Sequence, residues 1–527
     1  MMGALTADDQ REVIAFLSER STYNPPPMSI ERIDTHASIV FLAGAFAYKI
    51  KRAVELDYLD FSTLEKRRLA CERELAVNGT TAPGLYLGLV GIVRKLDGGL
   101  GLGEAGDVVE WAVKMRRFDQ RDLFSRRALA GQLDRALMAP LAAHIAAFHD
   151  HANVDRHADA EKLLSDVITS TVVVFTGASN VIEPADTKAY SNAVLGVFAE
   201  VAELLRERGR QGFVRRCHGD MHLNNIVLLD GQPTLFDAIE FSEKIATVDT
   251  LYDLAFLLMD LWHRGLTGHA NAVFNRYLEE AGESGNYEGL RALPLFLSVR
   301  AAVRAMVTID TLPHLTGSER DAAAETAADY FATAQDMIAP NAPNLIAVGG
   351  LSGTGKSRLS AALAPIIGGA PGAVHLRSDV ERKAMFGVER TAKLGAEGYT
   401  QEASERVYSR LIDKARAVLQ AGHSVIIDAV SAAPDHRQMI KKLGTDTGVQ
   451  SRGIWLSAPR EELIKRVDGR SGDASDADAG VVEQQLGWRT GPISWDIVDA
   501  GGAPPEVLAN AMRALGVEET GALRQVS

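Results

Sequence analysis

The second half of this chain is organised around the stretch GLSGTGKS, Gly350-Leu351-Ser352-Gly353-Thr354-Gly355-Lys356-Ser357. The stretch fits the pattern G-x-x-x-x-G-K-[ST] at every fixed position. It lies between an apolar run at 344–348 (NLIAV) and an amphipathic segment that starts at 358. A buried strand, a glycine-rich loop and a helix in this order predict a P-loop, whose backbone N–H groups hold nucleotide phosphates. The candidate nucleotide-binding residues are Gly350, Ser352, Gly353, Thr354, Gly355, Lys356 and Ser357, of which Ser357 is also a candidate magnesium ligand.

Two carboxylates downstream of the loop are candidates for chemistry. In HLRSDVER (375–382), Asp379 follows an expected strand, and Arg382 lies on the same face if the segment is helical. Asp379 would then deprotonate an acceptor hydroxyl while Arg382 holds a substrate anion. The alternative is a capped helix start with a solvated ion pair. Asp428 ends the apolar run SVIID (424–428), where a parallel strand would present it as a magnesium ligand, unless it only caps the next turn.

The region that follows has the pattern of a lid. A further strand is expected at 453–456, then a helix at 461–470 and a stretch rich in Gly, Ser and Asp at 471–480. Such a stretch is typical of a mobile lid, and Arg466 or Arg470 would bring positive charge to the transferred phosphoryl group when the lid closes. The alternative is that both arginines are exposed side chains on a charged helix.

With the P-loop, the Asp379-x-x-Arg382 pair and the arginines of the lid, residues 341–527 resemble the P-loop small kinases related to gluconate kinase, chloramphenicol phosphotransferase, the zeta toxins and polynucleotide kinase. The resemblance implies a P-loop NTPase fold, which is a doubly wound parallel sheet with helices on both faces. It also implies ATP and Mg²⁺ as cofactors.

The first half carries a second motif of a different design, His218-Gly219-Asp220-Met221-His222-Leu223-Asn224-Asn225. Its aspartate and asparagine have the spacing of the protein-kinase catalytic loop H-R-D-x-x-x-x-N. Asp220 would accept or orient the proton of the acceptor hydroxyl, and Asn225 would bind a magnesium ion. A predicted hairpin with its turn at 230–233 brings Asp237 back beside Asn225 as a second metal ligand.

A kinase of this design also needs a lysine on a strand that pairs with a glutamate on the next helix. A strand pair is expected within 39–50, and Lys49 stands where the kinase V-A-I-K strand has its lysine. Lys51 lies on the same strand face and is the rival candidate. The next helix offers Glu74 as the partner, with Glu72 as the alternative.

These parts follow one another in the order of a bilobal kinase, and residues 1–338 resemble the aminoglycoside phosphotransferase and choline kinase superfamily. The resemblance is strongest from 216 to 261. The segment before the strand lysine has no G-x-G-x-x-G loop, and Phe236 stands in place of an isoleucine. The resemblance implies a bilobal protein-kinase-like fold, with an N-lobe at about 1–118 and a helical C-lobe at about 119–338.

Length, composition and charge limit the remaining possibilities. At 527 residues the chain exceeds what one hydrophobic core normally organises, and Pro and Asn cluster in an expected linker at 339–344, before a P-loop kinase domain at 345–527. The net charge of −13 disfavours non-specific binding of nucleic acid, without excluding it for the second domain. No segment is expected to span a membrane and no signal peptide is recognised, so a cytoplasmic protein is expected. With only Cys71 and Cys217, no disulfide framework or structural zinc site is expected.

The two halves together resemble bacterial proteins described as bifunctional aminoglycoside phosphotransferase and ATP-binding proteins. The expected function is phosphoryl transfer from Mg-ATP at two centres, each with the hydroxyl of a small molecule as acceptor. Two alternatives stay open. The second domain is a polynucleotide or nucleotide-sugar kinase, or one domain is a nucleotide-binding regulator of the other.

Overall fold

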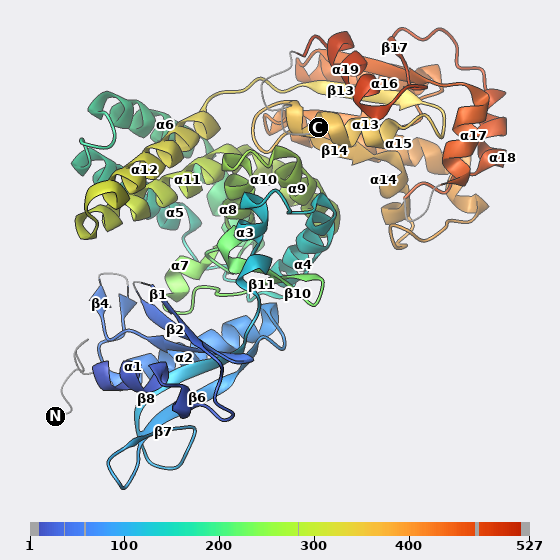
Figure 1. The fold of residues 1–527 in the computed structure, drawn as a ribbon. Helices are drawn as coiled ribbons and strands as arrows, with labels where there is room; N and C mark the ends of the chain where they lie inside the picture. Colours follow the sequence, from blue (N-terminus) through green and yellow to red (C-terminus); the bar gives the residue numbers. More distant parts are fainter. Residues whose placement is uncertain (1–9, 36, 57–58, 283, 470–473, 518–527) are drawn as a thin grey trace. The chain divides into compact units, whose positions relative to one another are not determined.

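The computed structural model describes residues 10–35, 37–56, 59–282, 284–469 and 474–517 (Figure 1). By its internal contacts the chain forms two compact units, the first of 1–163 with 209–257 and the second of 164–208 with 258–527. These two units are defined by contacts between residues. The domain limits predicted from the sequence stay a prediction. Residues 339–344 contain neither a helix nor a strand.

The first unit contains an antiparallel sheet of six strands in the order β1-β2-β3-β8-β6-β7. The strands are β1 (Ile30–Asp34), β2 (Ser38–Ala43), β3 (Phe46–Lys51), β6 (Tyr86–Arg94), β7 (Leu100–Leu102) and β8 (Asp107–Arg116). Side chains alternate along a strand, so β2 serves two hydrophobic cores. Phe41 packs in one core with Leu17 of α1 (Arg11–Ser18), and Leu42 packs in the other with Cys71 of α2 (Leu64–Thr81). The expected strand pair within 39–50 is the β2–β3 hairpin.

The rest of the first unit surrounds the predicted catalytic loop. Its elements are α3 (Phe124–Leu129), α4 (Met138–His151), β9 (Val214–Arg216), β10 (Ile226–Leu229), β11 (Gln232–Leu235), α7 (Glu243–Ala246), β12 (Thr247–Asp249) and the start of α8 (Thr250–His263). β10 and β11 form the expected hairpin, but its turn is only Asp230-Gly231, and both residues have positive φ angles of 50° and 79°. The predicted turn at 230–233 is therefore too long by two residues, because Gln232 already pairs with Leu229.

The second unit begins with a group of helices. They are α5 (Ala160–Gly177), α6 (Pro184–Gln211), α9 (Thr267–Ala281), α10 (Ser284–Gly289), α11 (Leu293–Thr311) and α12 (Gly317–Ile338). α11 packs along α12, and Phe296 and Leu297 of α11 are buried.

One helical stretch among the described residues, Asn286–His314, is long and apolar enough to cross a membrane, with a mean hydropathy of 1.6. The expectation that no segment has this length and composition is therefore wrong. In the structure, 67% of the apolar window is buried inside the protein. The stretch is therefore apolar because it packs in the protein core. Hydropathy alone does not distinguish a buried core helix from a helix that crosses a membrane.

The P-loop part of the second unit is a parallel sheet of five strands in the order β14-β15-β13-β16-β17. The strands are β13 (Leu345–Gly350), β14 (Val374–Arg377), β15 (Val425–Asp428), β16 (Ser451–Ser457) and β17 (Asp496–Asp499). The helices are α13 (Lys356–Leu363), α14 (Ser378–Met385), α15 (Gln401–Gln420), α16 (Pro434–Thr447), α17 (Arg460–Asp468), α18 (Ala479–Leu486) and α19 (Pro504–Ala514). α13 packs against α19, and α15 packs against α14 and α16. The doubly wound fold predicted from the P-loop is confirmed (Figure 1).

Candidate active sites

The catalytic loop of the first unit brings its functional side chains together as predicted. The Nδ2 group of Asn225 donates hydrogen bonds to the main-chain oxygen of Asp220 (2.9 Å) and to its Oδ2 (2.8 Å). The N–H of Phe236 donates to the carbonyl of Asn225 (3.0 Å), so Asp237 follows beside it. The side chains of Asp220 and Asp237 are 37% and 40% exposed. Carboxylate and amide oxygens that reach solvent are the donor set that Mg²⁺ prefers.

The contacts of the two rival lysines and of the two rival glutamates differ. Glu74 is buried and binds both lysines: its Oε1 lies 2.9 Å from Nζ of Lys49, and its Oε2 lies 2.6 Å from Nζ of Lys51. Glu72 instead pairs with Arg68 at 2.5 Å on the exposed side of α2. Lys49 is the lysine that also contacts Asp237, at 2.5 Å.

Lys51 has a partner that the sequence pattern did not suggest, the carboxylate of Glu240. Both lysines and Glu240 are buried, so the site is a compact ionic cluster. Burial alone would lower the pKa of Lys49, but the charges of Asp237 and Glu74 raise it well above the usual value. Burial would likewise raise the pKa of Glu74, but the two lysines hold it at about 2. The lysines and Glu74 therefore stay charged, since each buried charge has a close partner.

A buried carboxylate that was not among the predicted site residues, Asp253 of α8, holds the catalytic loop from behind. Its Oδ2 accepts the N–H of His218 (3.1 Å) and lies 3.1 Å from Nε2 of His149, and its Oδ1 accepts the N–H of Gly219 (2.8 Å). His218 itself donates from Nε2 to the carbonyl of Phe236 (3.0 Å). This agrees with the interpretation of His218 as a loop-fixing residue. The signal for Asp253 was its place as one of two acids in an otherwise apolar helix, where an acid is rarely buried without a partner.

The same region contains a triad of possible metal donors, His149, Cys217 and Asp253, whose donor atoms lie within 4.8 Å of one another. Both carboxylate oxygens of Asp253 already accept backbone N–H groups. The contacts therefore favour a structural role in the loop over metal binding.

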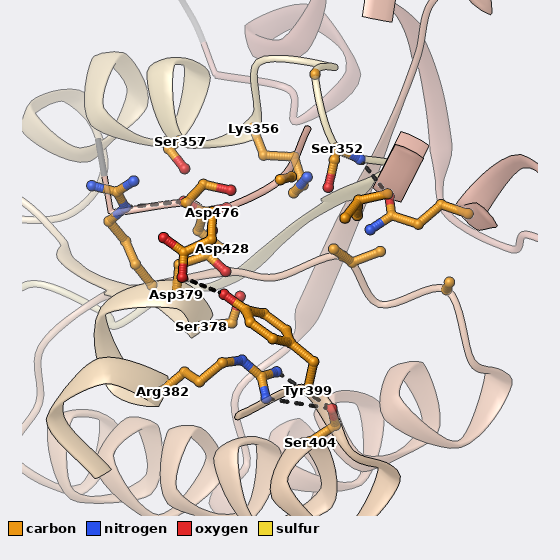
Figure 2. A pocket seen from close by; sticks show the side chains of 18 of the residues that line it. Ser352, Lys356, Ser357, Ser378, Asp379, Arg382, Tyr399, Ser404, Asp428 and Asp476 are labelled. Atoms are coloured by element: carbon orange, nitrogen blue, oxygen red, sulfur yellow. Dashed lines mark hydrogen bonds and ion pairs between the residues drawn. The ribbon is translucent and has the colours of Figure 1, made fainter. Parts of the chain in front are cut away.

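The P-loop part of the second unit contains a cavity of about 1220 Å³. Of the predicted site residues, Ser352, Gly353, Gly355, Lys356, Ser357, Asp379, Arg382, Asp428 and Arg466 line it. Figure 2 shows Lys356, Ser357, Asp379 and Asp428 around the same space. Residues from four separate segments meet here because the carboxyl ends of parallel strands share one edge of the sheet. Arg470 lies outside the described residues.

Gly350 and Thr354 do not line the cavity, although both belong to the motif. Gly350 has a φ of 131°, and a Cβ there would lie 2.5 Å from the carbonyl oxygen of Leu456. Thr354 is buried and donates from Oγ1 to the carbonyl of Leu351 (2.7 Å). These two residues shape the loop. Lys356, in contrast, lines the cavity, and its Nζ donates to the carbonyl of Leu351 (3.0 Å).

Asp379 lies in the first turn of α14 and Arg382 in its last turn, and both line the cavity. Burial raises the pKa of Asp379, although Lys356 works against the increase. The guanidinium of Arg382 donates to the carbonyl of Gly398 (2.5 Å) and lies 5.1 Å from the ring centre of Tyr399. Its Nε is buried and has no hydrogen-bond partner among the described residues.

Asp428 ends β15 and is 3% exposed. Its Oδ2 accepts a hydrogen bond from Nε2 of His375 (3.2 Å) and lies 3.7 Å from Nε of Arg377. Burial would raise the pKa of Asp428, but the hydrogen bond from His375 and the nearby positive charges hold it at about 2. An ionised carboxylate in the same cavity as the Ser357 hydroxyl fits a magnesium site. The role of His375 was missed because a lone histidine in an apolar strand carries no spacing signal.

In the lid region, the helix expected at 461–470 is α17 (Arg460–Asp468), and α18 begins at Ala479 within the stretch predicted as a lid. Arg466 of α17 pairs with Glu462 at 2.8 Å and faces the cavity. Asp476 in the following loop accepts hydrogen bonds from Nζ of Lys383 (3.0 Å), the N–H of Leu394 (3.0 Å) and the hydroxyl of Tyr399 (2.6 Å, Figure 2). This carboxylate therefore ties the described part of the loop to the α14 side of the cavity.

Comparisons with known proteins agree with this architecture. Residues 345–492 match the family model of the AAA domain. Over 469 residues the chain is 28% identical to an uncharacterized protein of Mycobacterium tuberculosis, with 87% of this chain and 90% of that protein covered. It is also 33% identical over 118 residues to an adenylyl-sulfate kinase of Myxococcus xanthus, with 22% of this chain and 59% of that protein covered.

Two solved structures each match a part of the chain. A gluconokinase from Sinorhizobium meliloti is 19% identical and covers 33% of this chain and 92% of its own, with a TM-score of 0.25. A choline/ethanolamine kinase family protein from Mesorhizobium loti is 11% identical and covers 62% of this chain and 99% of its own, with a TM-score of 0.38.

The P-loop domain predicted from the second motif is thus matched by the parallel five-stranded sheet and by the AAA domain model over residues 345–492.

Proposed function

We propose that the protein transfers the γ-phosphoryl group of ATP to hydroxyl groups of small molecules at two separate centres. The observation that supports this most is that each unit gathers a carboxylate base beside further oxygen donors and a lysine. In the first unit these are Asp220, Asn225, Asp237 and Lys49, called here the first-unit centre. In the second they are Asp379, Asp428, Ser357 and Lys356, called the P-loop centre.

In the first-unit centre, Asp220 takes the proton of the acceptor hydroxyl while the hydroxyl oxygen of the acceptor attacks the γ-phosphorus of ATP. The bond between that phosphorus and the bridging oxygen breaks, and ADP leaves with the electron pair. Asn225 holds the base in place through the 2.8 Å hydrogen bond to its Oδ2. Lys49, fixed by Glu74, is positioned for the phosphates.

In the P-loop centre, Asp379 takes the acceptor proton and Lys356 binds the outer phosphates. Arg382 lines the same cavity and binds an anionic group of the acceptor. Arg466 faces the same cavity and adds positive charge beside the transferred group.

Magnesium fits both centres by donor chemistry: Asn225 and Asp237 would hold it in one, and Ser357 and Asp428 in the other. When bound, it neutralises charge on the phosphate oxygens.

Binding stoichiometry tests the proposal on the full-length protein. Calorimetric titration with a non-hydrolysable ATP analogue and Mg²⁺ is expected to give two sites per chain. Lys356→Met and Lys49→Met are each expected to leave one site, because each removes the cation that pairs with phosphates. Lys95→Met, at an exposed lysine that pairs with Glu104 (3.1 Å), is the control and retains both sites.

A wild-type protein that binds no Mg-ATP would contradict the proposal as a whole. Once binding is established, ATP consumption is measured with sugars, aminoglycosides, nucleosides and oligonucleotides that carry a 5′ hydroxyl. Consumption only with oligonucleotides would favour the polynucleotide alternative for the P-loop centre.

The pH dependence of the P-loop centre follows from the raised pKa of Asp379. A raised pKa means that the carboxyl group keeps its proton to a higher pH, and only the ionised form accepts a proton from the acceptor. In the Lys49→Met background, turnover is therefore expected to fall on acidification at a higher pH than for an ordinary aspartate. A rate that stays constant down to the pH range of an exposed carboxyl would exclude Asp379 as the base.

A further inference from the structure

Helix α9, which lies N-terminal to the P-loop part, covers the edge of the P-loop sheet. β14 is an edge strand of this sheet. The side-chain oxygen of Asn275 accepts the N–H of His375 (2.6 Å), and its Nδ2 group donates to the carbonyl of Ala373 (3.2 Å). Residues two apart on a strand point their backbone groups to the same side. The amide of Asn275 thus takes the place of a neighbouring strand.

A second asparagine one turn earlier reinforces this contact. Nδ2 of Asn271 donates to the carbonyls of Pro371 (3.0 Å) and Ala373 (3.0 Å), and Asn271 is only 2% exposed. Its Oδ1 accepts a hydrogen bond from Asn275 (3.0 Å), which orients the second amide. The side chains of both asparagines therefore bind the backbone at the strand edge.

The contact between these helices and the P-loop part extends beyond the two asparagines. Nε2 of His423, a buried residue beside β15, donates to the carbonyl of Leu290 (2.8 Å). Burial lowers the pKa of His423 to about 4, so the ring is neutral at physiological pH. A buried hydrogen bond of this kind is costly to leave unmade, so the helices and the sheet pack as one body.

The strand residue held by Asn275 is the one that holds the metal carboxylate. His375 is fixed by α9 through its backbone N–H, and its imidazole donates to Oδ2 of Asp428 (3.2 Å). Asp428 faces the cavity of the P-loop centre. Two hydrogen bonds, one to the backbone and one from the side chain of His375, therefore link α9 to the carboxylate of Asp428.

We infer that Asn275 is a positioning residue of the P-loop centre, which sets the place of Asp428 through His375. The role of Asp428 as a metal ligand rests on the proposed function. The P-loop centre is then completed by α9, a helix of the same compact unit that precedes the expected linker. Groups that orient a metal ligand commonly change metal affinity by about 10- to 100-fold when they are removed.

The test uses full-length protein with Asn275→Leu, which keeps the size of the side chain and removes both hydrogen bonds to the strand edge, together with the bond to Asn271. Amide hydrogen exchange without metal or nucleotide is measured for the peptide that covers 373–377. Faster exchange at His375 is expected, since its N–H loses its acceptor. The affinity for Mg²⁺ in the presence of the ATP analogue is expected to fall about tenfold, with little change in metal-free nucleotide binding.

Two further variants separate positioning from general damage. Glu279→Gln lies on the same helix, where Glu279 is 3.7 Å from Arg390, and it is expected to leave both readouts unchanged. His375→Ala keeps the backbone contact with Asn275, so it is expected to reproduce the loss of Mg²⁺ affinity without the faster exchange.

Unchanged exchange and unchanged Mg²⁺ affinity in Asn275→Leu would overturn the inference. Faster exchange in that variant with full Mg²⁺ affinity would also overturn it, because α9 would then hold the strand without acting on Asp428. A wild-type protein without any Mg-ATP binding would instead contradict the proposed function, while hydrogen exchange would still test the contact itself.

Discussion

Asp220→Asn is expected to lower turnover at the first-unit centre by about 10²- to 10⁴-fold and to leave the P-loop centre unchanged, because it removes one general base and keeps the shape of the side chain. Asp379→Asn is expected to have the reverse effect. The measurement is acceptor phosphorylation with labelled ATP, using one acceptor for each centre from the substrate screen. Nucleotide binding is expected to persist in both variants, since neither residue is assigned to the phosphates.

The comparison of these two variants also separates the proposed function from regulation. If Asp379→Asn leaves every phosphorylation unchanged while its site still binds ATP, the P-loop part acts as a nucleotide-binding regulator. If either variant abolishes both activities, the chain has one chemical centre that depends on both parts. Two independent losses are the outcome that the two-centre proposal requires.

Asp253→Ala is expected to combine a large loss of stability with loss of activity at the first-unit centre. The substitution removes the acceptor of two backbone N–H groups, those of His218 and Gly219, in a region where Asp253 is fully buried. Each buried donor left without a partner costs about 1–3 kcal/mol, so the free energy of unfolding should fall by about 2–6 kcal/mol. The catalytic loop then loses the support that presents Asp220.

Denaturant unfolding and phosphorylation at the first-unit centre are the two measurements for this variant. Asp260→Ala is a matched control, because Asp260 is a buried acid on the same helix that pairs with Arg264 (2.8 Å). It is expected to lower stability and to retain activity in the remaining folded protein. Full activity of folded Asp253→Ala would contradict a positioning role for this carboxylate.

The parts of both sites that are encoded within a short stretch could be predicted from the sequence. The spacing between Asp220 and Asn225, and the run from β13 through Lys356 and Ser357, place their groups by local geometry alone. Two apolar runs on either side of a short turn likewise identified the strand that carries Lys49. In these cases the information lies within one short stretch of the sequence.

The parts that depend on contacts between distant segments could not be predicted. The choice between Glu72 and Glu74 depends on how α2 is rotated against the sheet, and only the packed structure buries Glu74. Asp253 meets a loop more than thirty residues away, and Asn275 meets His375 a hundred residues away. No period or motif connects such positions, because tertiary packing decides them.

The asparagine cover on β14 has a consequence for how such a chain can be divided. An edge strand with open N–H and C=O groups is a template for pairing with strands of other molecules, and it promotes aggregation. Here the outer groups of Ala373 and His375 are occupied by amides of α9. A fragment that starts at the linker would present a bare sheet edge, so poor solubility of the separated P-loop part would reflect a missing cover and not a defective core.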